Sequence, residues 1–317
     1  MLYAFRAAVA FFLLLALSAD GRAQLSVRAS YGSLGVSQVV LPLGVRAGIF
    51  EKNGLTVEPV YIAGRSVSAV VGGDVQFGFM GGPPAVLARL GGADLVIIAG
   101  KNGLDQILIA VPSVKTPNDL VGKNVGISRF GTTSDYGARI GLKQLKLQPQ
   151  KDVTLIQIGD TAARVGGMSS GALAAATLSV GEEEYIRKLG FHILTDNANV
   201  EFPGNVIVTT QRYLKTNRDV VKKFIRGLVG TIAFVKRQPE KTKSLLVSIY
   251  RQTDHAVIDK RYEAMLALFP DYPYLTGNAV RSFLEILREE GKVKGALDAE
   301  PFLDMSLLQE VEKENKR

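Results

Sequence analysis

The sequence predicts an α/β protein of two lobes, in which two mainly parallel sheets flanked by helices are joined by two crossover strands. The chain has 317 residues, a length that allows about two domains. Hydrophobic residues make up 47% and charged residues 21%, so the chain can bury a sizeable core. Short apolar runs alternate with segments of helical periodicity, as in βαβ units. The same order of elements occurs twice, which indicates two lobes of similar design.

The first run of elements starts with a strand over 26–31 and a small polar loop over 32–37. A helix is expected over 38–52, because Asn53-Gly54 is a typical C-terminal cap. The run continues with a strand over 55–62, a short helix that ends at Gly72-Gly73, a strand over 75–80, a helix that starts at Pro83-Pro84 and a strand over 93–99. The strand over 75–80 is apolar enough to be buried on both faces of a parallel sheet.

The second run repeats this order from residue 124 onward. Its expected elements are a strand over 124–128, a loop over 129–134, a helix over 135–147, a strand over 153–158, a helix to about Ser170, a strand over 172–178 and a loop over 179–181 that opens the next helix. Each strand is again followed by a loop of glycine, serine and threonine. Ligands of open parallel sheets bind beyond the carboxyl ends of the strands, where these loops lie.

Two apolar segments, 107–111 and 205–210, are interpreted as crossovers between the lobes. Lobe one would then hold residues 24–111 and 206–317, and lobe two would hold residues 112–205. Two connecting strands form a hinge about which the lobes can close.

The first 23 residues are interpreted as a secretory signal peptide. An apolar stretch over 7–19 follows Arg6, and as a helix it would span about 20 Å, against a hydrocarbon core of about 30 Å. The small-residue sequence Gly21-Arg22-Ala23 suits cleavage. An uncleaved N-terminal anchor is the alternative. Cleavage predicts a protein of the periplasm.

Composition excludes several classes of function. The chain has no cysteine and two histidines, His192 and His255, so thiol chemistry and soft-metal sites are excluded. We expect no metal and no cofactor. Gly167-Met-Ser-Ser-Gly171 matches the G-x-S-x-G pattern of hydrolases, but the order of helix and strand around it is the reverse of a nucleophile elbow. It is interpreted as a turn, and His192 as a structural residue of a strand.

The net charge of +8 is concentrated in residues 211–251, which hold 11 Lys or Arg and 2 Asp or Glu. A nucleic-acid surface is one interpretation. However, aromatic residues do not interleave the basic ones, and the segment shows helical periodicity. We expect two helices, one capped by Thr216 with Asp219 in the capping-box position and one opened by Pro239. Lys222, Lys223 and Arg226 would form a solvated face, so no nucleic-acid partner is expected.

Several motifs in the correct order resemble one family of binding proteins. They are Tyr31-Gly-Ser-Leu-Gly-Val-Ser37, Gly48-Ile-Phe-Glu-Lys-Asn-Gly-Leu-Thr-Val-Glu58, Gly73-Asp-Val-Gln-Phe-Gly-Phe79, Thr116-Pro-Asn-Asp-Leu-Val-Gly-Lys-Asn-Val-Gly126 and Gly131-Thr-Thr-Ser-Asp-Tyr136. The chain is similar in these motifs to nitrate/sulfonate/taurine-type substrate-binding proteins of ABC transporters. This resemblance implies a type II periplasmic-binding-protein fold and delivery of a small molecule to a membrane permease, by a protein that we expect to be a monomer.

Candidate ligand-binding residues lie on the loops that follow the strands. Hydroxyls and free backbone N–H groups at a helix start suit an anion or a carbonyl group, although helix capping alone also explains them. Glycines allow a ligand to approach the backbone closely, although a tight turn needs them as well. The candidates are Ser33, Ser37, Gly81, Gly82, Gly131, Thr132, Thr133, Ser134 and Ser179.

Two arginines, Arg65 and Arg129, complete the candidate set. The planar guanidinium group suits a carboxylate, sulfonate or phosphate, and a solvated arginine is the alternative for each. Glu182, Glu183 and Glu184 would favour a cationic ligand if they faced the cleft, but we expect them to supply acidic charge to a helix start. The charge of the ligand therefore stays open, with an organic anion as one possibility.

Two other classes of function are compatible with the same fold. An enzyme of a cofactor-biosynthesis pathway would need acid or base groups in the cleft, and the loops are mostly neutral. A sensory module would use the bound state as a signal. The binding protein of an importer agrees best with a secreted chain that lacks catalytic motifs.

Overall fold

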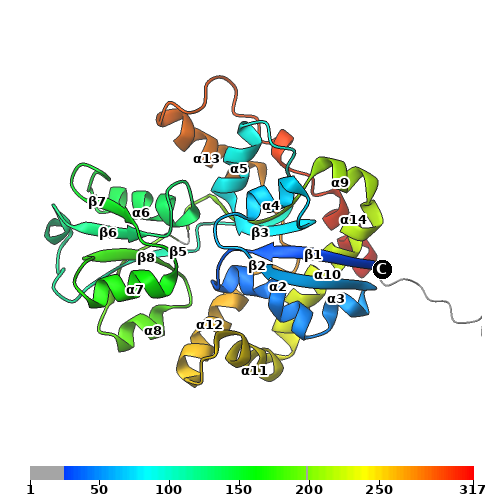
Figure 1. Cartoon of the computed structure of the whole chain (residues 1–317), viewed down its shortest axis with the longest axis horizontal. Helices are drawn as coiled ribbons and strands as arrows, with labels where there is room; N and C mark the ends of the chain where they lie inside the picture. Colours follow the sequence, from blue (N-terminus) through cyan, green and yellow to red (C-terminus); the bar gives the residue numbers. More distant parts are fainter. Residues whose placement is uncertain (1–24, 198) are drawn as a thin grey trace, which may run out of the picture.

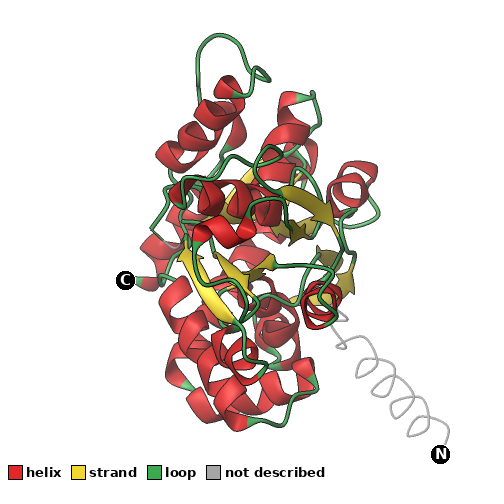
Figure 2. Ribbon diagram, turned by 90° about the vertical axis from the view of Figure 1, so that its left-hand side faces the viewer, coloured by secondary structure: helices red, strands yellow, loops and turns green. Residues whose placement is uncertain are grey.

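The computed structural model describes residues 25–197 and 199–317. Over these residues the chain forms two five-stranded sheets, each covered by helices (Figure 1). The view in Figure 2, turned by 90°, shows the strands lying between helices. The expected two-lobed α/β class is confirmed. The expected signal peptide lies outside the described residues, and within them no helix is long and apolar enough to cross a membrane.

The sheet of the first lobe has the strand order β2-β1-β3-β10-β4. Strand β1 pairs in parallel with β2 and β3, whereas β10 runs antiparallel to β3 and β4. Four strands therefore share one direction. The elements of this lobe before the first crossover are β1 (Leu25–Tyr31), α2 (Val36–Arg46), α3 (Ile49–Lys52), β2 (Leu55–Tyr61), α4 (Ser66–Gly72), β3 (Phe77–Gly81), α5 (Gly82–Leu90) and β4 (Val96–Asn102).

The sheet of the second lobe repeats this plan with the order β7-β6-β8-β5-β9. Strand β6 pairs in parallel with β7 and β8, and β5 runs antiparallel to β8 and β9. Its elements are β5 (Gln106–Ala110), η1 (Pro117–Leu120), β6 (Asn124–Ile127), α6 (Thr133–Gln144), β7 (Thr154–Gln157), α7 (Thr161–Ser169), β8 (Ala175–Ser179), α8 (Glu183–Lys188) and β9 (His192–Asp196).

The chain passes between the sheets one strand earlier than the sequence indicated. Strand β5 was expected in lobe one, but it lies inside the second sheet between β8 and β9. The first crossover is therefore the short segment 103–105. Strand β10 (Pro203–Thr209) belongs to the first sheet from its first residue, so the second crossover lies before residue 203. An apolar run predicts a buried strand, but it does not specify which sheet the strand joins.

The C-terminal third of the chain is helical and packs on the first lobe. Its elements are α9 (Gln211–Thr216), α10 (Arg218–Arg237), α11 (Pro239–Tyr250), α12 (His255–Leu268), α13 (Gly277–Glu289), η2 (Glu300–Phe302) and α14 (Ser306–Asn315). Pro239 opens α11 as expected. Thr216, however, is the last residue of α9, and Asn217 occupies the N-cap of α10. The Thr216 hydroxyl donates to the carbonyl of Arg212 instead, so the expected capping box is wrong.

The basic face of α10 is paired with the C-terminal helix. Lys222 Nζ lies 2.7 Å from a carboxylate oxygen of both Glu310 and Glu314. Arg218 and Arg226 each reach one of the same two carboxylates. Part of the expected solvated face is thus neutralised by α14, which removes the main support for a nucleic-acid surface.

The helix expected over 38–52 is divided in two. Helix α2 ends at Arg46 and α3 begins at Ile49, because Gly48 takes a left-handed conformation with φ of 67°. Behind these helices, Phe50 and Phe77 pack against Phe224 of α10 in the main core of lobe one.

One aromatic side chain joins the two lobes. Tyr136 of α6 is buried among the core residues of lobe one, with its ring centroid 4.8 Å from that of Phe283 and 6.2 Å from that of Phe202. Its hydroxyl lies 3.4 Å from a carboxylate oxygen of Glu290. Burial raises the pKa of this hydroxyl, and the Glu290 charge raises it further.

Candidate functional site

The loops that follow the parallel strands of the two lobes meet directly. A Cβ atom on Gly81, after β3, would overlap with Thr133 Oγ1 at the start of α6. A Cβ atom on Gly35, after β1, would lie 2.9 Å from Ser179 Oγ and 3.4 Å from Ser33 Oγ. The structure therefore brings Gly81 to Thr133, and the loop with Ser33 and Gly35 to Ser179, in two contacts between opposite lobes. A Cβ atom on Gly82 would overlap with the backbone carbonyl of Pro203, the first residue of β10 in the same lobe.

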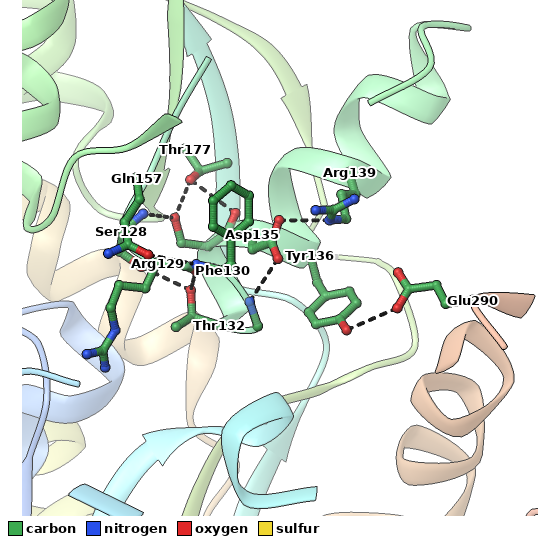
Figure 3. A network of polar contacts seen from close by, with 12 residues as sticks. Ser128, Arg129, Phe130, Thr132, Asp135, Tyr136, Arg139, Gln157, Thr177 and Glu290 are labelled. Carbon is green, nitrogen blue, oxygen red and sulfur yellow. Dashed lines mark hydrogen bonds and ion pairs between the residues drawn. The ribbon is translucent and has the colours of Figure 1, made fainter. Parts of the chain in front are cut away.

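The hydroxyls at the start of α6 are held mainly within their own lobe (Figure 3). Thr132 Oγ1 donates to the carbonyl of Arg129 over 2.6 Å. Ser134 Oγ accepts from the backbone N–H of Ser128 and lies 2.6 Å from Thr177 Oγ1. Thr133 alone among these three reaches the other lobe, with Oγ1 3.5 Å from the carbonyl of Gly204. Thr132 occupies the N-cap position, but its side chain makes no capping hydrogen bond.

A carboxylate already occupies the first turn of α6. Asp135 accepts a hydrogen bond from the backbone N–H of Gly131 at 2.9 Å and pairs with Arg139 at 2.8 Å. Gly131 itself has φ of 77°, which a residue with a side chain rarely adopts. Because Asp135 balances the positive end of the helix dipole, this end of α6 is less suited to an anion than the sequence indicated.

The two candidate arginines differ in their surroundings. Arg65 occupies the N-cap position of α4 and is exposed; its side chain makes no hydrogen bond or ion pair with any residue of the described ranges. Arg129 of lobe two donates to the backbone carbonyl of Gly64 in lobe one. Arg129 is therefore already engaged in a contact between lobes, whereas Arg65 is free to meet a ligand.

A polar network that the sequence analysis missed joins the first crossover to the start of α2 and to β10. Asp105 Oδ2 in the first crossover accepts from Ser37 Oγ and from Asn205 Nδ2, each at 2.7 Å. Gln38 donates to Asn205 Oδ1 at 3.1 Å and accepts from the backbone N–H of Gly32 at 2.7 Å. Ser37 is thus buried in the hinge rather than presented to the cleft. The only sequence signal was a charged residue, Asp105, between two apolar strands.

A second buried cluster joins the lobes through charged groups. Glu182, before α8, pairs with Arg261 of α12 at 2.8 Å, and both side chains are buried. The Arg261 guanidinium lies 4.0 Å from the centroid of the Tyr250 ring. Burial lowers the pKa of the neighbouring Arg164 to about 10. Of the three glutamates, Glu183 and Glu184 occupy the first turn of α8 as expected, whereas Glu182 bridges the lobes.

The hydrolase motif acquires no support from the geometry of the described residues. Within residues 25–197 and 199–317, no group of three or more His, Asp or Glu side chains could hold a metal ion. The G-x-S-x-G segment runs from the end of α7 into the turn before β8, which is the order opposite to a nucleophile elbow. His192 begins strand β9, as expected.

The comparison with known families identifies the chain. The model of a family described as "NMT1/THI5 like" matches residues 42–242, more than half of the chain. The protein belongs to the NMT1/THI5-like family. The taurine-binding periplasmic protein of Escherichia coli K12 is 26% identical to this NMT1/THI5-like chain over 170 residues. That match covers 51% of the chain and 52% of the relative, so it spans about half the length of the curated protein.

Solved structures of binding proteins share the fold of this NMT1/THI5-like chain. The alkanesulfonate-binding protein SsuA of Xanthomonas axonopodis pv. citri, bound to MOPS, has a TM-score of 0.73 at 17% identity, covering 87% of this chain and 97% of its own. The nitrate-binding protein NrtA of Synechocystis PCC 6803 has a TM-score of 0.70 at 13% identity, covering 91% and 88%. The resemblance predicted from the sequence motifs and the periplasmic-binding-protein fold are thereby confirmed.

Proposed function

We propose that this protein captures a small molecule between its two lobes and delivers it to an ABC importer. The observation that carries this proposal is the direct meeting of Gly81 with Thr133 and of Gly35 with Ser179, which come from loops of opposite lobes. Groups on two lobes joined by short crossovers can enclose a ligand completely, and closure then depends on the ligand. The named relatives are binding proteins rather than enzymes.

The ligand that this arrangement supports best is a small organic anion. Arg65 is exposed, adjoins the Gly64 contact between the lobes and has no side-chain partner in the described chain, and a guanidinium group binds sulfonates and carboxylates through paired hydrogen bonds. The relatives are named for taurine, alkanesulfonate and nitrate, and their names favour the same class. Ser33, Thr133 and Ser179 would add neutral hydrogen bonds from both lobes.

The partner and the location follow from the same proposal. The protein would work in the periplasm as a monomer, after removal of residues 1–23, and would dock on a membrane permease. The functional lobes would be residues 25–102 with 203–317 and residues 106–196, in agreement with the two sheets.

Purification from the periplasm without refolding tests this proposal. The protein would be expressed with its own N-terminus in a Gram-negative host and recovered by osmotic shock, and native mass spectrometry would then measure the mass of any bound compound. We expect an N-terminus within a few residues of Gln24 and a bound species heavier than the polypeptide by one small molecule. Recovery of the intact chain in the cytosol, with no bound compound, would contradict the proposal.

A further inference from the structure

A groove on lobe one has no part in the contacts between the lobes. It lies between the C-terminal end of α4, the turn before β3 and helix α9, and it has a volume of about 240 Å³. Strand β3 begins beside the groove at Phe77 and ends at Gly81, which meets Thr133 of lobe two. The groove is therefore at the opposite end of this sheet from the other lobe, and α9 lies on the side of lobe one that faces away from lobe two (Figure 1).

The walls of this groove are largely apolar. Val70 and Val75 line it and are buried, whereas Val71 lines it and is 40% exposed. The Tyr213 ring also lines it and is held edge-on against Phe77, with 5.9 Å between the ring centroids. Apolar surface in contact with water is stabilised when another apolar group covers it. The groove thus offers an apolar contact surface whose shape is fixed by the core of lobe one.

One cation at the groove has no partner. Arg212 of α9 is the only charged residue among those that line the groove in the described chain. It is exposed, and its side chain makes no hydrogen bond or ion pair within residues 25–197 and 199–317. The carboxylate of Asp94 instead accepts from the backbone N–H groups of Gln211 and Arg212. An unpaired guanidinium group beside an apolar surface suits an anion that carries an apolar body.

A neutral hydrogen-bond donor lies at the same groove. Gln76 lines it, and its Oε1 accepts from the backbone N–H of Arg28 at 2.8 Å. Its Nε2 makes a single long contact of 3.5 Å, with the carbonyl of Gly73. An amide nitrogen carries two N–H groups, so at least one of them is available to a ligand.

We propose that this groove is a second binding site, which takes a small organic carboxylate with a compact apolar body. The carboxylate would meet Arg212, and the apolar body would cover Val71 and the Tyr213 ring. Pockets for drug-sized ligands measure about 300–1,000 Å³, so the volume of about 240 Å³ favours a smaller molecule, such as an acid with one aromatic ring. Every residue that lines the groove belongs to lobe one, so the site would bind its ligand whether the lobes are open or closed.

Three probes that separate the two parts of this ligand test the proposal. Benzoate has the carboxylate and the apolar body, benzamide has the body without the charge, and acetate has the charge without the body. Each would be titrated into protein with isotope-labelled valine methyl groups, so that NMR reports binding at Val70, Val71 and Val75. We expect benzoate to bind with a dissociation constant of about 1 mM, and benzamide and acetate to bind about 10-fold more weakly or worse.

A matched pair of variants assigns the effect to the groove. Arg212→Gln should weaken the binding of benzoate about 10-fold, because it removes the charge-assisted bond. Lys215→Gln removes an exposed positive charge from the same helix, but Lys215 does not line the groove, so the affinity should not change. Both side chains are exposed, and thermal unfolding followed by circular dichroism would verify that both variants fold.

The outcomes separate this site from the one proposed between the lobes. Saturating shifts of the three valine methyl signals with benzoate, weakened in Arg212→Gln and not in Lys215→Gln, would support the second site. No shift of these signals, or equal affinities for the three probes, would overturn it. An equal effect of the two variants would also overturn it, because the overall charge of α9 would then attract the anion. None of these results bears on ligand capture between the lobes.

Discussion

At the scale of single residues, the decisive difference lies between the two candidate arginines, Arg65 and Arg129. Arg129 already donates to the Gly64 carbonyl of the other lobe, whereas Arg65 is exposed and makes no side-chain contact within the described ranges. Each arginine follows the end of a strand in a loop of mostly small residues, and only the structure separates the two roles. Arg129 belongs to the closure of the lobes, and Arg65 is the cation available to a ligand.

The first prediction concerns Arg65→Ala. A hydrogen bond to a charged group is worth about 1.5–3 kcal/mol, so the affinity for an anionic ligand should fall about 10- to 150-fold. Thermal stability without ligand should not change, because the side chain has no partner to lose. Calorimetric titration with the co-purified compound measures the effect. Unchanged affinity would mean that Arg65 is ordinary surface and that the ligand is not held as an anion.

The second prediction concerns Gly64→Ala. Gly64 has φ of 73°, and a Cβ atom there would overlap with the Arg129 guanidinium. Gly48→Ala is the matched control, because Gly48 has φ of 67° and nothing lies within 4 Å of its Cβ position. Each substitution should lower stability by about 1–2 kcal/mol through backbone strain.

Only Gly64→Ala should also weaken ligand binding, because its Cβ atom displaces the Arg129 guanidinium from the hydrogen bond that joins the two lobes. Thermal unfolding of both variants and titration with the co-purified ligand make the comparison. Equal affinities in the two variants would show that the contact between Gly64 and Arg129 has no part in closure.

At the scale of elements, the ion pairs between α10 and α14 predict a dependence on pH. Hydrogen bonds from Lys222 and Arg218 hold the pKa of Glu310 below the ordinary value of 4.5. Hydrogen bonds from Lys222 and Arg226 do the same for the pKa of Glu314. A carboxyl group whose pKa is depressed by folding contributes stability above its unfolded pKa. That contribution is lost as the pH falls through the lower pKa of the folded state.

The third prediction compares the wild type with the Glu310→Gln/Glu314→Gln double variant. The wild type should have the higher melting temperature at pH 7, and the difference should shrink as the pH falls below about 4.5. Glu289→Gln serves as a control, because Glu289 is exposed and lies 3.8 Å from Lys143 in a looser pair. If the melting temperatures of the wild type and the double variant differ by the same amount at pH 7 and at pH 3, the ion pairs do not have this effect on stability.

The elements also show how far the sequence could predict the fold. Alternating periodicity located most strands and helices, since each is specified by local pattern. Sheet membership of β5 depends on which strands lie beside it, and no local pattern encodes this. Thr216 failed as a cap because the preceding segment is itself a helix, capped by Thr210. The capping-box pattern was present, but a tertiary arrangement overrode it.

At the scale of the whole molecule, loop position predicted the location of the site but not the direction of its side chains. Ser37 and Ser134 belong to the correct loops, yet Ser37 bonds to Asp105 in the hinge and Ser134 to Thr177 inside lobe two. Asp105 and Asn205 were missed because Asp105 lies in the first crossover and Asn205 in strand β10, and neither belongs to the glycine-rich loops. A shift of one position along the loop decides whether a polar side chain points towards the other lobe or towards the sheet of its own lobe.

The two lobes of the structure are in contact at several separate points. Tyr136 packs against Phe283, and Glu182 pairs with Arg261. These contacts describe a closed arrangement, and a binding protein must also open to admit its ligand. The loss of hydration of Glu182 and Arg261 offsets much of the attraction between their charges. These contacts therefore do not by themselves hold the lobes closed when no ligand is bound.

Small-angle X-ray scattering of the protein with and without its co-purified ligand tests this central claim most directly. The loaded protein should give the scattering curve calculated from the closed structure, and the ligand-free protein should have a larger radius of gyration, because only the ligand shifts the population towards closure. An identical radius of gyration in the two states, with ligand binding verified on the same sample, would contradict capture by closure of the two lobes.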